Sequence, residues 1–553
     1  MKKILIVHNH YQVAGGEDTV VANEKRLLEE QGHEVILYTR DNSELKEMSF
    51  FHKLMLPITT IYNPKTVRDV CRILRGEDSG VDAGAVGAGN RDSAREDNTV
   101  GDVGAAGANS TGRKVDIVHV HNTLNLVSPS VYYAARKCGV PVVQTVHNFR
   151  LLCPGALFYR DGKVCEDCIS KGLGCALKHK CYRGSFVQTL ACVLSLSFHR
   201  LMGIYGKINY ICLTEFNREK LLSIKQIDPA RVYVKPNMVL GAGVAVGKEA
   251  CVGDAETSER GAETGVRDAE ASEIVAGNER KNQMIYAGRL DETKGIKFMF
   301  RAWEKIVKDA CVADANDAAC EDDANHAMRA AGVKAVKLSQ IPKLIVYGDG
   351  ELKNWCEEFI AGNSEMESAA GDRFIDGDSE MEAAAGGQLD SGENSAVKLS
   401  DYIEMRGFAD NEEVLRELSV SKASILPTQL YEGFPMGIVE AFSVGTPVIC
   451  SDIGNAGSVV RDGVTGYKFI MEDELVECVK KICVGDGVDA CAEDGACMGE
   501  GVCACDAVVR NGACAEDAIA IGDLYQNARV EFVQKYTPEK NYQMLMEIYD
   551  KCY

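Results

Sequence analysis

Short runs of apolar residues alternate with longer amphipathic segments along most of the chain. In its first part, the predicted strands are Lys3–Val7, Glu34–Tyr38, Val115–His121, Val140–Val146 and Ile208–Leu213, with predicted helices at Glu17–Gln31 and Val131–Cys138. Buried strands of a parallel sheet read as continuous apolar runs, and helices connect them. The pattern therefore predicts a doubly wound α/β domain.

A second series of the same kind begins near residue 282. Its predicted strands are Asn282–Ala287, Lys343–Tyr347, Tyr402–Arg406, Ala423–Leu426 and Pro447–Cys450, and its predicted helices are Ile296–Val307, Leu352–Ile360 and Met436–Val444. We predict two Rossmann-like domains joined near Val234–Met238, one over residues 1–238 and one over 239–536. A helix at 537–553 is expected to return to the first domain.

Five stretches rich in Ala, Gly, Asp and Glu interrupt this pattern, at 76–114, 240–281, 309–335, 361–397 and 484–520. Each lies between predicted elements, and we expect disordered or weakly helical loops without chemistry of their own. Their acidic excess is larger than the net charge of −21 of the whole chain, so the rest is slightly basic. Acidity argues against general nucleic-acid binding, whereas a mildly basic body suits an anionic small substrate.

Neither an export signal nor a membrane span is expected. The apolar run Ile4–Val7 follows the first three residues, and it is too short for a signal peptide. Every apolar run is well below the ~18 residues that a span needs. We therefore expect a cytoplasmic protein whose 22 cysteines are mostly reduced thiols.

Two glycine-containing turns follow predicted strands. Gly15 and Gly16 precede a helix, whose free N–H groups can bind an anion; a plain helix-starting turn explains them equally well. In the second domain Gly288-Arg289-Leu290 is followed by Lys294, and two cations at the end of a strand can bind a diphosphate. Arginine and lysine are also common on surfaces.

The segment from Tyr431 to Phe442 carries the strongest chemical signal. Glu432 lies in a turn rich in Gly and Pro, and Glu440 lies one turn into the following predicted helix. One carboxylate can bind a sugar ring while the other binds ribose hydroxyls, and Gly437 lets a ligand approach the helix start. The apolar neighbours of both residues argue against a pair of solvated surface glutamates.

The order of these motifs resembles the retaining glycosyltransferases of family 4, which have the GT-B fold of two Rossmann-like domains and an interdomain cleft. The resemblance covers the chain outside the five stretches, and rests on Gly15-Gly16, Asp116-Ile-Val-His-Val-His121, Gln144-Thr-Val-His-Asn148, Lys235-Pro-Asn237, Gly288-Arg-Leu290 with Lys294-Gly295, Gly348-Asp-Gly350, and Glu432 with Glu440.

The resemblance implies roles for individual residues. Arg289 and Lys294 would bind the diphosphate, Glu432 the donor sugar, Glu440 the ribose, and His147 the sugar from the first domain. The implied donor-binding set is Gly15, Gly16, Gly288, Arg406, Gly407, Phe408, Gly433, Phe434, Pro435, Met436, Gly437, Ile438 and Glu440. Arg406–Phe408 would border the base.

The implied reaction is same-face transfer with retention, without a metal ion or other cofactor for catalysis. The leaving diphosphate takes the acceptor proton while basic side chains stabilise its charge. A UDP-hexose is the first expected donor, a GDP-sugar the second, and the acceptor a glycan or lipid-linked glycan of cell-surface polysaccharide synthesis. Another nucleotide-sugar enzyme of this fold, such as a 2-epimerase or a synthase, and a non-catalytic scaffold are the alternatives.

A cysteine-rich loop follows His147 and departs from the commonest pattern of the family. Cys153, Cys165, Cys168 and Cys181 could hold a structural zinc ion, although Cys175 competes for a place and the spacing is irregular. Reduced packing thiols are the alternative. Basic residues of this loop, next to the amphipathic segment Ser185–Tyr205, could meet an anionic acceptor or the inner membrane surface; a solvated loop with an ordinary helix explains them as well.

Overall fold

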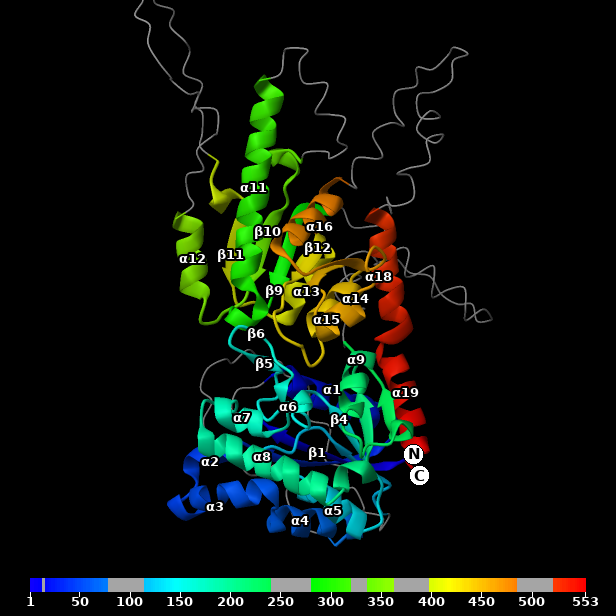
Figure 1. The fold of residues 1–553 in the computed structure, drawn as a ribbon. Coiled ribbons are helices and arrows are strands. Elements are labelled where there is room, and N and C mark those ends of the chain that lie inside the picture. Colours follow the sequence, from blue (N-terminus) through cyan, green and yellow to red (C-terminus); the bar gives the residue numbers. More distant parts are fainter. Residues whose placement is uncertain (12–14, 78–113, 240–279, 320–335, 363–396, 485–520) are drawn as a thin grey trace, which may run out of the picture. The chain divides into compact units, whose positions relative to one another are not determined.

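The computed structural model describes residues 1–11, 15–77, 114–239, 280–319, 336–362, 397–484 and 521–553 (Figure 1). Most of each of the five low-complexity stretches lies outside these residues. The chain divides into two compact units. Unit 1 comprises Met1–Arg160, Cys165–Leu240 and Pro538–Tyr553, and unit 2 comprises Asp161–Val164 and Gly241–Thr537.

Unit 1 is built on a six-stranded parallel sheet in the order β2-β1-β3-β4-β7-β8. These strands are β1 (Lys3–His10), β2 (Glu34–Asp41), β3 (Ile117–Val120), β4 (Val142–Val146), β7 (Asn209–Cys212) and β8 (Val232–Val234). The helices are α1 (Gly16–Glu30), α2 (Glu44–Glu47), α3 (Phe50–Ile61), α4 (Pro64–Arg75), α5 (Ser130–Lys137), α6 (Asp167–Ser170), α7 (Gly174–His179), α8 (Phe186–Leu201), α9 (Glu215–Leu222) and α19 (Pro538–Lys551). The strands β5 (Tyr159–Arg160) and β6 (Lys163–Val164) form a separate short pair.

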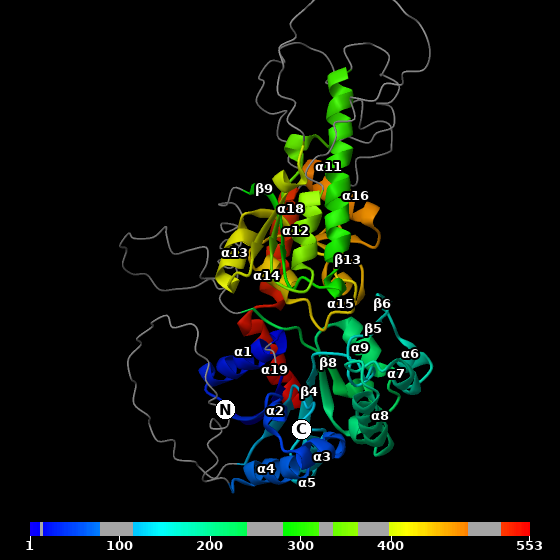
Figure 2. The same cartoon turned by 90° about the vertical axis from the view of Figure 1, so that its left-hand side faces the viewer.

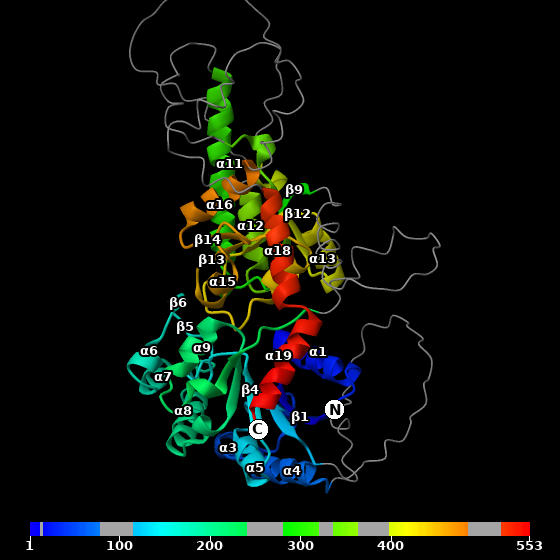
Figure 3. The same ribbon diagram turned by 90° about the vertical axis from the view of Figure 1, so that its right-hand side faces the viewer.

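The last helix, α19, completes the core of unit 1. It lies beside α1 (Figure 3), and its Leu545, Ile548 and Tyr549 pack with Ile4 and Ile6 of β1 and other buried residues. Because α19 supplies apolar side chains that the preceding part of the unit lacks, unit 1 is built from segments that are far apart in the chain.

Unit 2 has a second six-stranded parallel sheet, in the order β11-β10-β9-β12-β13-β14. Its strands are β9 (Lys281–Ala287), β10 (Lys343–Tyr347), β11 (Ile403–Gly407), β12 (Ser421–Leu426), β13 (Val448–Ser451) and β14 (Gly466–Phe469). Its helices are α11 (Ile296–Ala319), α12 (Lys353–Gly362), α13 (Asn411–Ser419), α14 (Met436–Ser443), α15 (Gly454–Val459), α16 (Glu472–Val484) and α18 (Ile521–Lys535). A core around Phe300 and Trp303 of α11 fills one face of the sheet.

The predicted fold class is confirmed, with two local corrections. Helix α11 continues to Ala319, beyond the predicted end at Val307 and into the stretch from residue 309, where a disordered or weakly helical loop was predicted. The segment 309–319 is rich in alanine, which has the highest helix propensity, so the helix extends into it. The second correction concerns the region after residue 450, where the sequence pattern predicted no strand: Gly466–Phe469 forms the edge strand β14, which pairs with β13.

The strand order of each sheet reverses at one point. In unit 1 this point lies between β1 and β3, and in unit 2 between β9 and β12. Ligands of open α/β sheets bind outside the carboxyl ends of the strands at such a reversal. The loops after β1, β3, β9 and β12 are therefore the places to look for a functional site.

Candidate functional site

Lys294 and Glu432 meet at the reversal point of unit 2. Lys294 lies in the short 3₁₀ turn after β9, and Glu432 lies in the loop after β12. The Lys294 Nζ atom is 2.6 Å from Glu432 Oε1, which also accepts a hydrogen bond from the Thr428 hydroxyl at 2.8 Å. Both charged side chains are largely buried, with exposed fractions of 18% and 13%. A cation and a carboxylate thus lie side by side at the carboxyl ends of the central strands β9 and β12.

Glycines make this contact possible because they allow the loops to approach closely. Gly295 has φ 70°, and a Cβ atom there would lie 1.8 Å from the Pro427 carbonyl oxygen. The Gln429 N–H donates to the Thr293 carbonyl at 2.8 Å, which ties the two loops together. At Gly348, where φ is 146°, an added Cβ would lie 1.9 Å from the Gly288 carbonyl oxygen. The Gly-Asp-Gly motif after β10 is therefore explained by packing against the turn after β9.

Glu440 is the second predicted carboxylate of unit 2. It lies on α14, and burial raises the pKa of its carboxyl group. Within the described part of the chain, its carboxylate has no hydrogen-bond or ion-pair partner. At Gly437, on the same helix, no described atom comes within 4 Å of an added Cβ. A half-buried acceptor next to open space is suited to bind hydroxyl groups of a ligand.

Five other residues of the predicted donor-binding set follow Glu432 directly in the chain or begin the next helix. Gly433 accepts a hydrogen bond through its carbonyl from the buried Asn455 side chain at 2.9 Å. Phe434, Pro435, Met436 and Ile438 lead into or begin α14, and Ile438 is fully buried. Asn455 and Thr428 were not predicted as site residues, because single polar residues after a strand carry no distinctive sequence signal.

Two predicted basic residues are held by carboxylates. Arg289 is 74% exposed and pairs with Asp291 at 3.3 Å within its own turn. Arg406 donates to Glu404 at 2.8 Å and to the Tyr347 hydroxyl at 3.0 Å, and it pairs with Glu417 at 3.1 Å. Gly407 follows with a φ of 73°, which glycine adopts freely, and Phe408 is 86% exposed. Lys294 and Glu432 are brought together; Arg289 and Arg406 are placed in separate pairs.

Unit 1 gathers histidines at the carboxyl ends of its central strands. His121 Nδ1 is 2.9 Å from His147 Nε2, and His121 Nε2 is 3.3 Å from Glu24 Oε1. Burial lowers the pKa of His121 to about 4 and that of His147 well below its ordinary value. Both rings are therefore neutral near pH 7, so each has one donor and one acceptor nitrogen.

Glu24 of α1 is a buried anion that the sequence analysis missed. Burial would raise its pKa, but the charges of His119 and Lys235 outweigh burial and hold it well below the ordinary value. Its Oε1 lies 2.8 Å from His119 Nδ1, and its Oε2 lies 3.4 Å from Lys235 Nζ. The Lys-Pro-Asn motif is therefore structural at Lys235, which neutralises this carboxylate.

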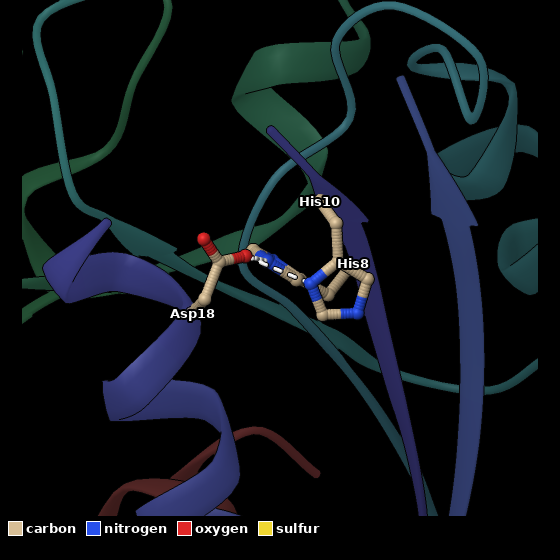
Figure 4. Close-up of side chains that lie close together, drawn as sticks. All are labelled: His8, His10 and Asp18. Atoms are coloured by element: carbon tan, nitrogen blue, oxygen red, sulfur yellow. Dashed lines mark hydrogen bonds and ion pairs between the residues drawn. The ribbon is translucent and has the colours of Figure 1, made fainter. Parts of the chain in front are cut away.

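The glycine turn of unit 1 is fixed by Asp18 (Figure 4). One carboxylate oxygen of Asp18 lies 2.8 Å from His8 Nε2 and 2.8 Å from His10 Nδ1, and the other accepts from the Gly15 N–H at 2.9 Å. Added Cβ atoms at Gly15 and Gly16 would meet no described atom within 4 Å. Asp18 thus fixes the backbone at Gly15, and within the described part of the chain there is room for a ligand beside the two glycines.

Glu17, which directly precedes Asp18, was also not predicted as a site residue. Burial raises the pKa of its carboxyl group to about 8, and it accepts a hydrogen bond from the Tyr11 hydroxyl at 3.1 Å. A titrating carboxyl group in the first turn of α1 is the kind of group that takes part in proton transfer.

His147 also lines a pocket that lies within unit 1. Polar side chains of His121, His147, Asn148 and Arg150 form part of the wall, and Leu151, Tyr205, Cys192, Ser195 and Leu196 form a less polar part. The last three belong to α8. The pocket is thus lined by both polar and apolar side chains.

Two sets of side chains among the described residues lie close enough together to hold a metal ion. The ligand atoms of His8, His10 and Asp18, and those of Glu24, His119 and His121, lie within 4.8 Å of one another in each group. The thiols of the cysteine loop, which were predicted to bind zinc, do not form such a group of three among the described residues. Cys168 hydrogen-bonds with Cys153 and interacts electrostatically with Cys165 and Cys181. The Cys153 sulfur accepts hydrogen bonds from the backbone N–H groups of Gly155, Ala156 and Phe158.

The comparisons with known proteins agree with the fold. Residues 391–484 match the family profile described as "Glycosyl transferases group 1". A crystal structure of a glycosyltransferase from Rickettsia africae aligns over 100% of this chain and 98% of its own, with a TM-score of 0.50 and 12% identity. No curated protein matches the chain.

Further similar structures include Anabaena Alr3699/HepE in complex with UDP, with 12% identity, coverage of 99% and 98%, and a TM-score of 0.45. The lipopolysaccharide outer core galactosyltransferase WaaB has 13% identity, coverage of 99% and 98%, and a TM-score of 0.47. The chain has the GT-B fold of two Rossmann-like domains. Within it lies a stretch of glycosyltransferase group 1 sequence, which includes β11 to β14 and Glu432 with Glu440.

Proposed function

We propose that the protein is a retaining glycosyltransferase of family 4. It transfers a hexose from a nucleotide sugar, first of all a UDP-hexose, onto a glycan or lipid-linked glycan in the synthesis of cell-surface polysaccharide. The observation that carries the proposal is the contact of Lys294 with Glu432 at the reversal point of the second sheet. Glu440 lies on α14, which follows the loop of Glu432, and among the described residues its carboxylate has no partner. This arrangement offers a cation for phosphate and two carboxylates for hydroxyl groups.

The proposed reaction uses the diphosphate of the donor as the base. As the bond between the sugar and the phosphate breaks, the leaving oxygen gains negative charge and takes the proton of the incoming hydroxyl group. Lys294 and Arg289 stabilise that charge, while Glu432 and Glu440 orient the sugar and the ribose. His147 binds the donor sugar as a neutral ring whose tautomer is set by His121.

No step of this reaction requires a metal ion, because basic side chains supply the positive charge. We expect the enzyme to work in the cytoplasm, at the inner face of the membrane, where lipid-linked acceptors are held. Turnover should be the same with and without added Mg²⁺ or Mn²⁺. A strict requirement for either ion would contradict this part of the proposal.

A radiolabelled donor assay with membrane glycan acceptors tests the function. Transfer of label to the acceptor is the expected result, and a thermal-shift panel of UDP- and GDP-sugars identifies the donor beforehand. Conversion of the nucleotide sugar without an acceptor would indicate a 2-epimerase, transfer to a sugar phosphate a synthase, and binding without turnover a scaffold.

We also propose a structural zinc ion in the cysteine loop, bound by Cys153, Cys165, Cys168 and Cys181. The support is the side-chain contact of Cys168 with Cys153 and the three N–H groups that donate to the Cys153 sulfur, since such donors stabilise a thiolate. Gly155 lets the segments of the loop approach, because an added Cβ would lie 3.0 Å from the Cys181 carbonyl oxygen and 3.7 Å from the Cys153 sulfur.

Metal analysis of the purified chain tests this site. One zinc ion per chain is expected, with loss of the ion in Cys168→Ser and retention in the control Cys138→Ser, whose thiol lies outside the loop. Absence of zinc from the wild-type protein, together with no thermal stabilisation by added zinc, would leave the cysteines as packing thiols.

A further inference from the structure

Helices α3 and α8 of unit 1 pack against each other (Figure 2). Both expose large apolar side chains. They and the residues that directly follow them supply twelve of the nineteen exposed large apolar side chains among the described residues, so the exposure is concentrated in one region. The twelve are Phe50, Phe51, Leu54, Met55, Ile58, Tyr62, Phe186, Val187, Leu194, Phe198, Leu201 and Met202. We call this group the α3–α8 face.

The exposure is too extensive to be incidental. Phe50 is 76% exposed, Phe51 75% and Leu201 85%. Single exposed apolar residues are normal on soluble proteins, but a gathering of this size on adjacent helices marks an interaction surface. Helix α8 uses its other side for packing, since its Cys192, Val193 and Leu196 are buried.

The charged residues around the α3–α8 face indicate what kind of partner it binds. The chain carries a net charge of −21, yet it has no Asp or Glu between residues 168 and 214 or between 48 and 68. Helix α7, which packs against α8, and the turns that flank it expose basic side chains. These are Lys178, Lys180 and Arg183, and the imidazole of His179 is exposed with them. Lys171 is also exposed, but it pairs with Asp167 at 2.8 Å. The α3–α8 face therefore has a basic border.

We propose that the α3–α8 face docks onto a lipid bilayer with anionic head groups. An apolar surface with a basic border inserts its side chains at the boundary of the acyl chains, while the lysines and arginines bind the head groups. Among the described residues, no helix is long and apolar enough to cross a bilayer. A second copy of the chain is disfavoured as the occupant, because a symmetric contact would bring two basic borders together.

Docking would also bring the pocket of unit 1 close to the lipid. Cys192, Ser195 and Leu196 of α8 line that pocket, whereas Leu194, Phe198 and Leu201 of the same helix are exposed. One helix, about 10 Å thick, then separates the bilayer surface from the pocket that contains His147. This step rests on the proposed function: an acceptor anchored in the membrane would reach the pocket past α8.

Flotation of the full chain with vesicles tests the docking. We expect binding to vesicles with about 30% phosphatidylglycerol, at least about tenfold weaker binding to pure phosphatidylcholine, and weakening with salt. The double variant Phe51→Glu/Leu201→Glu should lose binding to the anionic vesicles. The matched control Ile470→Glu/Met471→Glu, at two exposed apolar residues of unit 2, should bind as the wild type does.

The outcomes separate this proposal from its alternatives. Equal binding of both double variants, or no binding of the wild type, would overturn it. Light scattering that shows a wild-type dimer, with a monomer only for Phe51→Glu/Leu201→Glu, would assign the face to a second copy. Transfer to a short soluble acceptor is measured in parallel, so that a failure of the transferase function is seen independently of vesicle binding.

Discussion

The Nζ atom of Lys294 lies 2.6 Å from Oε1 of Glu432, although 138 residues separate them along the chain. Without a ligand, each residue neutralises the other. A bound diphosphate would offer Lys294 a second anion, and a donor sugar would offer Glu432 hydroxyl groups. The pair is thus ready for a substrate that carries both chemical features, and the burial of both side chains strengthens either interaction.

We expect Lys294→Ala to lower kcat by about 10²–10³-fold with little change in thermal stability, because it removes a charge that stabilises the leaving diphosphate. Arg289→Ala should act in the same direction. Lys297→Ala is the control, since Lys297 is a neighbouring lysine that pairs with Glu292. Near-normal turnover in both site variants would refute the assigned roles.

For Glu440, substitution by Gln should weaken donor binding by about 10–100-fold, because a charged hydrogen bond to the ribose is lost. Burial raises the pKa of this carboxyl group, so the wild-type affinity should also fall as the pH drops through that raised pKa. The variant should lack this part of the pH dependence. Titration calorimetry with the donor measures both, with the exposed Glu357→Gln as the control. Unchanged affinity would exclude Glu440 from the ribose site.

Two glycines should respond differently to alanine. Gly295→Ala should destabilise the chain by more than the roughly 1–3 kcal/mol that a positive φ alone costs, because the new Cβ would overlap the Pro427 carbonyl oxygen. Gly437→Ala meets open space, so it should keep the wild-type Tm and weaken only donor binding. Thermal melts with and without the nucleotide sugar distinguish the effects. A Gly437→Ala protein with normal donor affinity would show that the ligand lies elsewhere.

Glu17 should make stability depend on pH in a specific window. Its pKa is about 8 in the folded chain and near 4.5 ordinarily, so the folded state holds an extra proton between these values. The contribution of Glu17 to the free energy of unfolding is therefore greatest below pH 4.5 and declines as the pH rises towards 8.

In Glu17→Gln this decline should disappear, so the Tm of the variant should fall less steeply than that of the wild type between about pH 5 and pH 8. The exposed Glu30→Gln is the control, and it should keep the wild-type slope. Parallel curves for wild type and Glu17→Gln would mean that the carboxyl group is ionised throughout this range.

The sequence allowed prediction of both sheets and of the loops that hold Lys294, Glu432 and Glu440, because continuous apolar strands and glycine turns are local signals. Glu24 could not be found in this way. Glutamate in an amphipathic helix is normally predicted to be solvated. In addition, its partners His119 and Lys235 are about 100 and 200 residues away along the chain, so no local pattern links them. The exposure of α3 was equally hidden, since its apolar residues have the spacing of a core helix.

The position of α19 has a consequence for how the chain folds during synthesis. Tyr549 binds His119 through its hydroxyl at 2.7 Å, and Asn541 accepts from Lys235 at 2.8 Å. Asn541 is synthesised some 300 residues after Lys235. Until then, unit 1 has no partner from α19 for Lys235, and the face of its sheet that α19 covers stays exposed. Unit 2 can complete its own sheet during that interval, and the first-made half of the protein is thus the last to be finished.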